Sequence, residues 1–348
     1  MATAGRDRKV ADALLALVRS ALGLTGTPAV DWNVMSEADW QAILEMARRQ
    51  TVTGLLFRGV ALLPEDIQVP DSLLFPLMEE TDRIRRQSRL VERTAKEITE
   101  FFEGRILHPV ILKGPSVACL YPEPDLRESG DIDLYFNEKE FGKAVHAIRE
   151  RLQKDGQSES LTTLPDGSVH YKWNGIDIDQ HAQYFDLHTT EGLPPVPSPE
   201  ATLLMLSAHI LKHSMGAGIG LRQLCDMAMA YQTLPYDRSR LLASYDATNT
   251  ADWNRLLSSF LVSYLGAADI PYPEEQLPDP APLLDIVLGG GNFGHHEASR
   301  EKALQAGPVQ RKLDTARRFI RRLPFSLKYA SSELTARVKE LIQGNLKR

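Results

Sequence analysis

The first hundred residues place apolar side chains at the three- and four-residue spacing of an α-helix. The clearest stripe runs through Val10, Leu14, Leu17, Val18 and Leu22. A second helix is predicted to start at Ser36, because Ser36-x-x-Asp39 before an apolar stripe has the form of a capping box. A third is predicted over residues 77–104, with an apolar stripe along residues 90–101. These stripes indicate packing, and we assign no chemistry to them.

After residue 104 the helical period gives way to short extended runs. Residues 110–112 form an apolar run, and residues 131–136 and 175–181 alternate polar and apolar positions, as half-buried strands do. Pro165-Asp166-Gly167 is a turn signal between two extended runs and predicts a hairpin over residues 162–173. The helical period returns over residues 141–152, which predicts a helix covering the sheet.

A proline-rich stretch from Leu193 separates this region from a further series of predicted helices. Ser198 suits an N-cap and Pro199 a first helical position. The pattern predicts an α+β fold, in which N-terminal and C-terminal helical regions flank a small mixed β-sheet core. The predicted parts are an N-terminal helical region at 1–104, a core with the small mixed sheet at 105–192, a helical lobe at 193–310 and a basic helical tail at 311–348.

Charge distinguishes the last of these parts from the rest of the 348-residue chain. The whole chain has a formal net charge of −6, yet residues 311–348 carry eleven Lys and Arg residues against three acidic ones. Such a tail either binds an anionic partner, such as nucleic acid or a lipid surface, or lies across the acidic remainder of the protein. We favour the second interpretation, because charged helix faces are most often solvated or paired within the chain.

No apolar run in the sequence approaches the roughly 20 residues that a membrane-spanning helix needs. The N-terminus also lacks the charged, apolar and small-residue pattern of a secretory signal. We therefore expect the protein in the cytoplasm.

The candidate chemistry begins at Asp131 and Asp133. Because they alternate with Ile132 and Leu134, a strand would point both carboxylates to one face and the aliphatic side chains into a core. Residues two apart on a strand are roughly 6.6 Å from each other. That spacing suits the bridging of two divalent cations, which lie roughly 3.5–4 Å apart in phosphoryl-transfer sites. The pattern predicts a metal site.

The segment before this strand predicts a phosphate-binding turn. Gly114 allows a tight turn after the apolar run at 110–112, and Pro115 suits the first position of a helix over residues 116–120. Backbone N–H groups at a helix N-terminus are suited to phosphate oxygens.

The last alternating run supplies two further carboxylates, Asp177 and Asp179. A third carboxylate on a neighbouring strand would complete a cation site or accept the proton of an attacking hydroxyl. The spacing alone leaves both residues open for this role, and a polar-faced edge strand with no catalytic role is the simpler alternative.

Taken together, these motifs resemble a bacterial nucleotidyltransferase family of uncharacterised type in the DNA-polymerase-beta-like nucleotidyltransferase superfamily. The resemblance covers residues 105–185 and rests on Leu112-Lys113-Gly114, Arg127, Gly130-Asp131-Ile132-Asp133-Leu134 and Asp179-Gln180-His181. It implies a small mixed sheet, Mg²⁺ dependence with two ions, and transfer of a nucleoside monophosphate from an NTP. Weaker similarity continues at residues 222–226 and 290–294.

The resemblance also implies roles for individual residues. Asp131 and Asp133 correspond to the metal pair, and Asp179, through its Asp-x-His context, to the third carboxylate. Gly114 and Ser116 correspond to the turn that holds the triphosphate, although the superfamily places Ser directly after Gly and Pro115 intervenes here. Lys113 and Arg127 are expected to bind the nucleotide and neutralise charge as pyrophosphate leaves.

Two segments of the predicted helical lobe are further candidates for the same site. His209 and His213 lie four residues apart but lack the Glu of a zinc-peptidase motif, so packing is favoured over metal binding. The glycine-rich run at 289–294 suits either a surface loop or close approach to a ligand.

We therefore predict a Mg²⁺-dependent nucleotidyltransferase with ATP as the expected donor. The acceptor hydroxyl is left open between a small molecule, RNA and a protein. The alternative is a non-catalytic nucleotide- or RNA-binding protein that retains the fold. The complete carboxylate set favours the enzyme.

Overall fold

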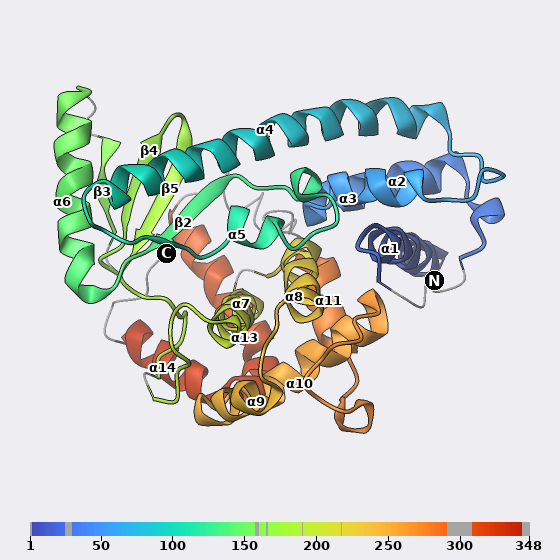
Figure 1. The fold of residues 1–348 in the computed structure, drawn as a ribbon. Coiled ribbons are helices and arrows are strands. Elements are labelled where there is room, and N and C mark those ends of the chain that lie inside the picture. Colours follow the sequence, from blue (N-terminus) through green and yellow to red (C-terminus); the bar gives the residue numbers. More distant parts are fainter. Residues whose placement is uncertain are drawn as a thin grey trace. The chain divides into compact units, whose positions relative to one another are not determined.

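The computed structural model describes residues 2–24, 30–156, 160–164, 166–189, 191–216, 218–290 and 308–342 (Figure 1). The chain divides into two compact units. Unit 1 comprises residues 1–83 and 187–334, and unit 2 comprises residues 84–186 and 335–348. Helices precede and follow the strands along the chain, so the predicted α+β class is confirmed. The domain boundaries predicted after residues 104, 192 and 310 stay predictions.

Unit 2 is built on a mixed five-stranded sheet with the strand order β1-β2-β5-β4-β3. Strands β2 and β5 run parallel, and the other three pairs are antiparallel. The strands are β1 (Val110–Ile111), β2 (Asp131–Tyr135), β3 (Thr162–Thr163), β4 (Val169–Trp173) and β5 (Ile176–His181). The antiparallel β3–β4 pair confirms the hairpin predicted over residues 162–173, although Pro165 of its turn lies outside the described residues.

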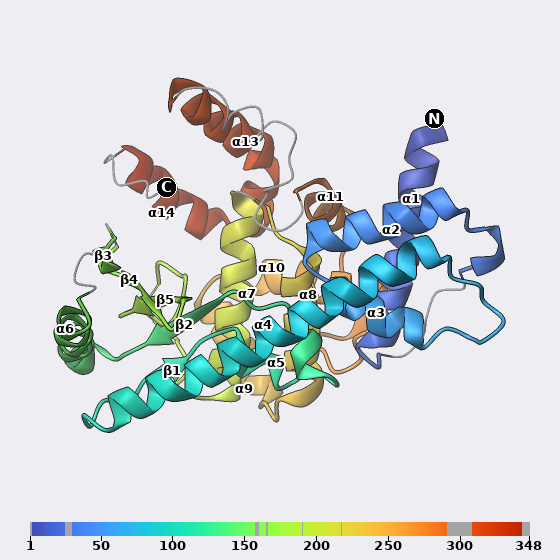
Figure 2. The same ribbon diagram turned by 90° about the horizontal axis from the view of Figure 1, so that it is seen from above.

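One face of this sheet is covered by two helices, α4 (Asp71–Glu103) and α6 (Glu138–Lys154), which lie along it in Figures 1 and 2. Both helices and strands β2, β4 and β5 contribute to the shared buried core, which includes Val91, Ile98, Phe102, Ile132, Leu134, Ile148, Tyr171 and Ile178. Because these apolar residues alternate with polar ones along each strand, the polar residues project from the opposite face.

Helix α4 starts six residues earlier than the sequence predicts and contains Pro76. Proline removes one helical hydrogen bond and is rare inside a helix, so the sequence predicts that the helix begins after Pro76, at residue 77. The remaining elements of unit 2 are short, namely α5 (Pro115–Ala118) and the 3₁₀ turn η2 (Pro124–Leu126).

Unit 1 is helical in its described residues. Its first segment contains α1 (Ala2–Ala21), η1 (Trp32–Val34), α2 (Glu37–Gln50) and α3 (Thr53–Ala61). Its second contains α7 (Pro199–Met215), α8 (Leu221–Thr233), α9 (Arg238–Ala247), α10 (Ala251–Phe260), the π-helical η4 (Leu261–Leu265), η5 (Glu274–Gln276), α11 (Ala281–Gly290) and α13 (Pro308–Tyr329). Helix α14 (Ser331–Ile342) begins in unit 1 and continues into residues assigned to unit 2.

Local sequence signals explain where two of these helices begin. The Ser36 hydroxyl accepts from the Asp39 N–H, and the Asp39 carboxylate accepts from the Ser36 N–H, so the predicted capping box is confirmed. Ser198 likewise accepts from the Ala201 N–H at the start of α7. A side-chain cap of this kind typically stabilises a helix by about 1 kcal/mol.

The two segments of unit 1 are joined through the buried side chain of Gln50. Its Nε2 donates to the Val287 carbonyl at 2.9 Å, and its Oε1 accepts from the Leu221 N–H at 2.8 Å. Both polar ends of a buried amide are therefore bonded to backbone that follows much later in the sequence. Replacing it would leave two buried backbone groups without these partners.

The basic tail takes part in the packing of unit 1. Helix α13 contacts α7, and the Phe325 ring lies 6.2 Å from that of Trp253 on α10, measured between centroids. Arg322 is buried, whereas Arg317 and Arg321 are exposed.

Within the described ranges, no helix combines the length and the apolar character that crossing a membrane requires.

Candidate active site

The acidic residues of β2 and β5 are register partners on neighbouring parallel strands. Asp131 pairs with Asp177, and Asp133 pairs with Asp179. Paired positions point their side chains to the same face, so four carboxylates project from the face opposite α4 and α6. The sequence predicted the face of each pair, and the parallel register brings the two pairs together.

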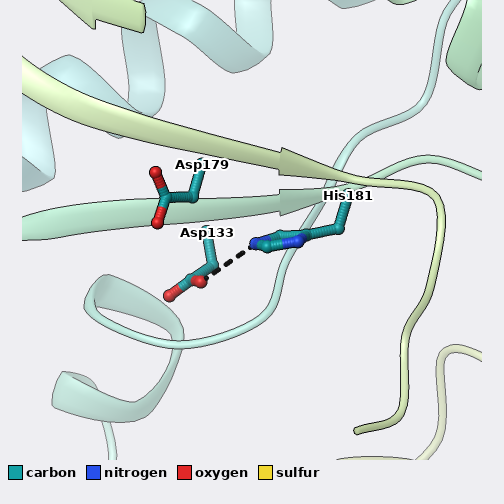
Figure 3. Close-up of side chains that lie close together, drawn as sticks. All are labelled: Asp133, Asp179 and His181. Carbon is teal, nitrogen blue, oxygen red and sulfur yellow. Dashed lines mark hydrogen bonds and ion pairs between the residues drawn. The ribbon is translucent and has the colours of Figure 1, made fainter. Parts of the chain in front are cut away.

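Three side chains form the centre of this face, and Figure 3 shows them projecting toward one another from β2 and β5. Asp133, Asp179 and His181 each offer one ligand atom, and these atoms all lie within 4.8 Å of one another. His181 Nε2 lies 3.3 Å from Asp133 Oδ1. Asp133 is the most enclosed, with a side-chain exposure of 11%, against 23% for Asp179 and 29% for His181. The outer pair, Asp131 and Asp177, is exposed.

Lys113 supplies a positive charge beside the buried carboxylate. It follows β1 along the chain, and its Nζ lies 3.2 Å from Asp133 Oδ1. Burial alone would lower the pKa of this ammonium group, but the charges of Asp133, Asp186 and Asp131 outweigh that effect and raise it. Lys113 therefore stays positively charged next to the carboxylates. Its contact with a nucleotide stays a prediction.

Asp179 has a partner that the sequence analysis missed. His170 is its register partner on β4, and the two side chains meet with His170 Nδ1 2.6 Å from Asp179 Oδ1. Burial, the largest effect, and the charges of Asp133 and Asp131 raise the pKa of the Asp179 carboxyl, whereas His170 and His181 lower it; the net result is a pKa of about 6. A carboxylate with a pKa in this range can accept a proton near neutral pH.

The predicted phosphate-binding turn has a backbone conformation that favours glycine. Gly114 has φ +67° and ψ −115°, and a Cβ at this position would lie 3.2 Å from the Asp131 carbonyl oxygen. The helix that follows, α5, is only four residues long, so any contact with phosphate would depend on its backbone N–H groups more than on a helix dipole. The turn and strand β2 approach each other closely at this point.

Ser116 lies beside this turn but has a local partner. Its hydroxyl donates to the Lys113 carbonyl at 3.4 Å. It also lines a shallow groove of about 410 Å³ together with Ile111, Pro115 and residues of α4. Binding of the triphosphate by Gly114 and Ser116 stays a prediction.

Arg127 supports the entry into β2. It is buried, its Nη1 donates to Ser129 Oγ at 2.6 Å, and its carbonyl accepts from Ser88 Oγ at 3.0 Å. The bond from Ser88 connects the segment before β2 to α4, and the bond to Ser129 lies within that segment. A direct contact between Arg127 and a nucleotide stays a prediction.

The two candidate segments of the helical lobe lie in unit 1. On α7 the rings of His209 and His213 lie edge to face, with centroids 4.5 Å apart, as the packing interpretation expects. Gly289 and Gly290 end α11, and residues 291–294 of the glycine-rich run lie outside the described residues.

Comparison with known proteins identifies the family. A family model described as an uncharacterised nucleotidyltransferase matches residues 36–263, about two-thirds of the chain. The protein therefore belongs to this nucleotidyltransferase family, as the resemblance of its motifs indicates. Neither the curated proteins nor the solved structures provide a match.

Membership of this family makes the protein a transferase with a nucleotide substrate. Nucleotidyltransferases generally use divalent metal ions, and the residues present fit that requirement. Two carboxylates and one imidazole converge on one point, which is a donor set that binds divalent cations.

Proposed function

We propose that this protein transfers a nucleoside monophosphate from an NTP, with ATP as the expected donor, to a hydroxyl acceptor. The reaction depends on divalent cations, two Mg²⁺ ions in the simplest form. The observation that supports it most strongly is the parallel register of β2 and β5, which sets Asp133 beside Asp179 on one face. Family membership supports the nucleotidyl group as the part transferred.

In this proposal Asp131 and Asp133 hold the cations, and Asp179 either completes their coordination or accepts a proton. When bound, the cations neutralise charge on the triphosphate and stabilise the attacking and leaving oxygens. The acceptor oxygen forms a bond to the α-phosphorus, the bond from that phosphorus to the β-phosphate oxygen breaks, and pyrophosphate leaves. In the second of its two roles, Asp179 receives the hydroxyl proton, and a pKa of about 6 suits that role.

Lys113 and the Gly114 turn are proposed to hold the part of the NTP that becomes pyrophosphate. The Lys113 ammonium group lies next to Asp133, so it would face the same phosphates as the cations. Most of the rate enhancement of such a reaction comes from positioning and charge stabilisation. Arg127 is proposed to help neutralise the negative charge of the leaving pyrophosphate.

The test is a transfer assay with each α-labelled NTP, Mg²⁺ and a cell extract, in which the fraction that gains label identifies the acceptor class. Asp133→Asn should abolish labelling, because a lost cation ligand removes several kcal/mol of transition-state stabilisation. Asp131→Asn should have the same effect if that residue holds the second cation. Each variant should unfold at a temperature close to that of the wild-type protein.

The third carboxylate is tested by comparing Asp179→Ala with Asp177→Ala. We expect Asp179→Ala to lose at least ~100-fold, the lower range for a missing general base, and Asp177→Ala to be milder. Asp177 is exposed and its carboxylate pairs with Lys172 at 3.1 Å. The reverse order would assign the role to Asp177. Full activity in Asp133→Asn would contradict the role of Asp133 as a cation ligand. Wild-type protein that binds NTP or RNA but labels no acceptor would favour the alternative, a nucleotide- or RNA-binding protein that retains the fold.

A further inference from the structure

The donor set at the centre of the site contains a nitrogen ligand. The sequence pattern predicted a centre made of carboxylates, Asp131, Asp133 and Asp179. The residues whose ligand atoms converge are instead Asp133, Asp179 and His181, while Asp131 is exposed at the end of β2. Because His181 lies on the same strand and face as Asp179, two positions further on, its place follows from the strand geometry.

The three donor atoms are close enough for a single cation. Ligands roughly 2.1 Å from an octahedral cation lie about 3 Å apart when adjacent and about 4 Å apart when opposite. The three atoms here lie within 4.8 Å of one another, and His181 Nε2 is 3.3 Å from Asp133 Oδ1. The upper limit of 4.8 Å exceeds these ligand–ligand distances, so binding a common ion would require side-chain rotation that draws the three atoms closer together.

Each carboxylate of this set also contacts a side chain that is not one of the three candidate ligands. His170 contacts Asp179 Oδ1 at 2.6 Å, and Lys113 contacts Asp133 Oδ1 at 3.2 Å. Such outer partners orient metal ligands and are typical of built metal sites. A carboxylate has about four lone-pair positions, so Asp133 can keep Lys113 as a partner while it binds a cation.

We infer that His181 Nε2 is a direct ligand and that the centre therefore binds a first-row transition dication, represented by Mn²⁺, more tightly than Mg²⁺. Mg²⁺ prefers oxygen donors, whereas an imidazole nitrogen favours transition metals. Mn²⁺ accepts carboxylates as readily as Mg²⁺ does, so it suits a set of two carboxylates and one imidazole. The inference rests on the proposed function, since it concerns the same centre, and it names the cation.

The rival arrangement leaves His181 as a hydrogen-bond donor to Asp133. In that case Nε2 carries a proton, and the cation is bound by oxygen atoms alone, with Asp131 as the additional ligand. Ligation through Nε2 requires that the cation take the place of this proton. The two arrangements differ in whether nitrogen is bonded to the bound ion, which can be measured directly.

The experiment uses the full chain without a histidine tag and Mn²⁺ as the probe. Loss of the free Mn²⁺ signal in electron paramagnetic resonance gives its Kd, competition with Mg²⁺ gives the preference, and pulsed spectra report ¹⁴N coupled to the bound ion. We expect Mn²⁺ to bind at least ~10-fold more tightly than Mg²⁺, with a ¹⁴N coupling. His181→Gln should remove the coupling and weaken Mn²⁺ binding by ~10-fold or more, with a much smaller effect on Mg²⁺.

Two matched variants identify the nitrogen. His146→Gln makes the same change on the exposed side of α6, where His146 pairs with Glu150, and should leave binding unchanged. His170→Gln should keep the coupling, because His170 contacts Asp179 rather than the ion. His181→Asp should shift the preference toward Mg²⁺ by restoring an all-carboxylate set.

The outcomes separate this inference from the proposed function. Wild-type protein without a ¹⁴N coupling, or with equal affinity for the two cations, overturns the inference even if nucleotidyl transfer proceeds with Mg²⁺. A coupling that survives in His181→Gln overturns it as well. A coupling that depends on His181, in a protein that labels no acceptor, upholds the metal ligand and contradicts the transfer reaction.

Discussion

His170 and Asp179 face each other across the β4–β5 pair, with 2.6 Å between Nδ1 and Oδ1. This contact fixes the direction of a carboxylate that has a proposed role in the reaction. It comes from a residue with no motif of its own. The side chain of His170 is partly exposed, so its replacement can change activity without a large change in stability.

We predict that His170→Ala lowers kcat by about 10- to 100-fold with little change in melting temperature, as loss of an outer partner of an active carboxylate does. His170→Asn keeps an N–H donor near the position of Nδ1 and should restore much of the activity. Lys172→Ala is the matched control, since Lys172 lies on the same strand and face and pairs with the outer Asp177. Equal losses in the His170 and Lys172 variants would contradict a specific role for His170.

The raised pKa of Asp179 predicts a pH-dependent stability. A carboxyl whose folded-state pKa is about 6, against about 4 in the unfolded chain, stabilises the fold when protonated. That contribution is complete below about pH 4 and is lost as the pH rises through about 6. In EDTA, Asp179→Asn should therefore become more stable than the wild-type protein between these values, by roughly 1–2 kcal/mol above pH 6 after allowance for solvent screening.

Melting temperatures from pH 4 to pH 8 measure this difference. Asp177→Asn removes one negative charge from the same face at an exposed position and serves as the control. Divalent cation should reduce or reverse the advantage of Asp179→Asn, because the ion offsets the repulsion between the carboxylates. Parallel curves for the wild-type protein and Asp179→Asn would show that burial does not raise this pKa.

The conformation of Gly114 predicts a cost for any side chain there. Its φ of +67° with ψ of −115° is a region that residues with a Cβ rarely adopt, and the added Cβ would lie 3.2 Å from the Asp131 carbonyl. Gly114→Ala should lower the free energy of unfolding by about 1–3 kcal/mol and reduce transfer activity. In the control Gly142→Ala, the new methyl group meets open space in the middle of α6 and should stabilise by about 0.5–1 kcal/mol. Denaturant titrations compare the two, and equal stability would contradict the strained turn.

The packing of α13 predicts what the basic tail does. Removing residues from Arg311 onward deletes the contacts of Phe325 with Trp253 and the buried Tyr329, so the melting temperature should fall. Exchanging the exposed Arg317 and Arg321 for Glu changes the charge by four units and preserves those contacts. We expect this double variant to keep its stability and to leave any RNA affinity as weak as in the wild-type protein. Tight RNA binding that weakens steeply with salt and is lost in the double variant would identify an anionic partner instead.

The sequence predicted local features of this fold better than relationships between distant segments. The faces of β2 and β5, the Ser36 and Ser198 caps and the helix over Phe141 followed from side-chain periods and capping chemistry. The register that places His170 opposite Asp179 did not follow, because alternation defines a face but not the neighbouring strand. His181 stood in the recognised motif, yet its convergence with Asp133 depends on the parallel β2–β5 pairing.

The discontinuity of unit 1 has a consequence for the order of folding during synthesis. Gln50 leaves the ribosome long before Leu221 and Val287, the residues to which it is bonded, so the amino-terminal helices cannot reach their final packing until the later helices have been made. Residues 84–186 are translated in between, and all five strands and the residues of the candidate centre lie within them. The sheet that carries the candidate centre can therefore form in the nascent chain before the second segment of unit 1 has been synthesised.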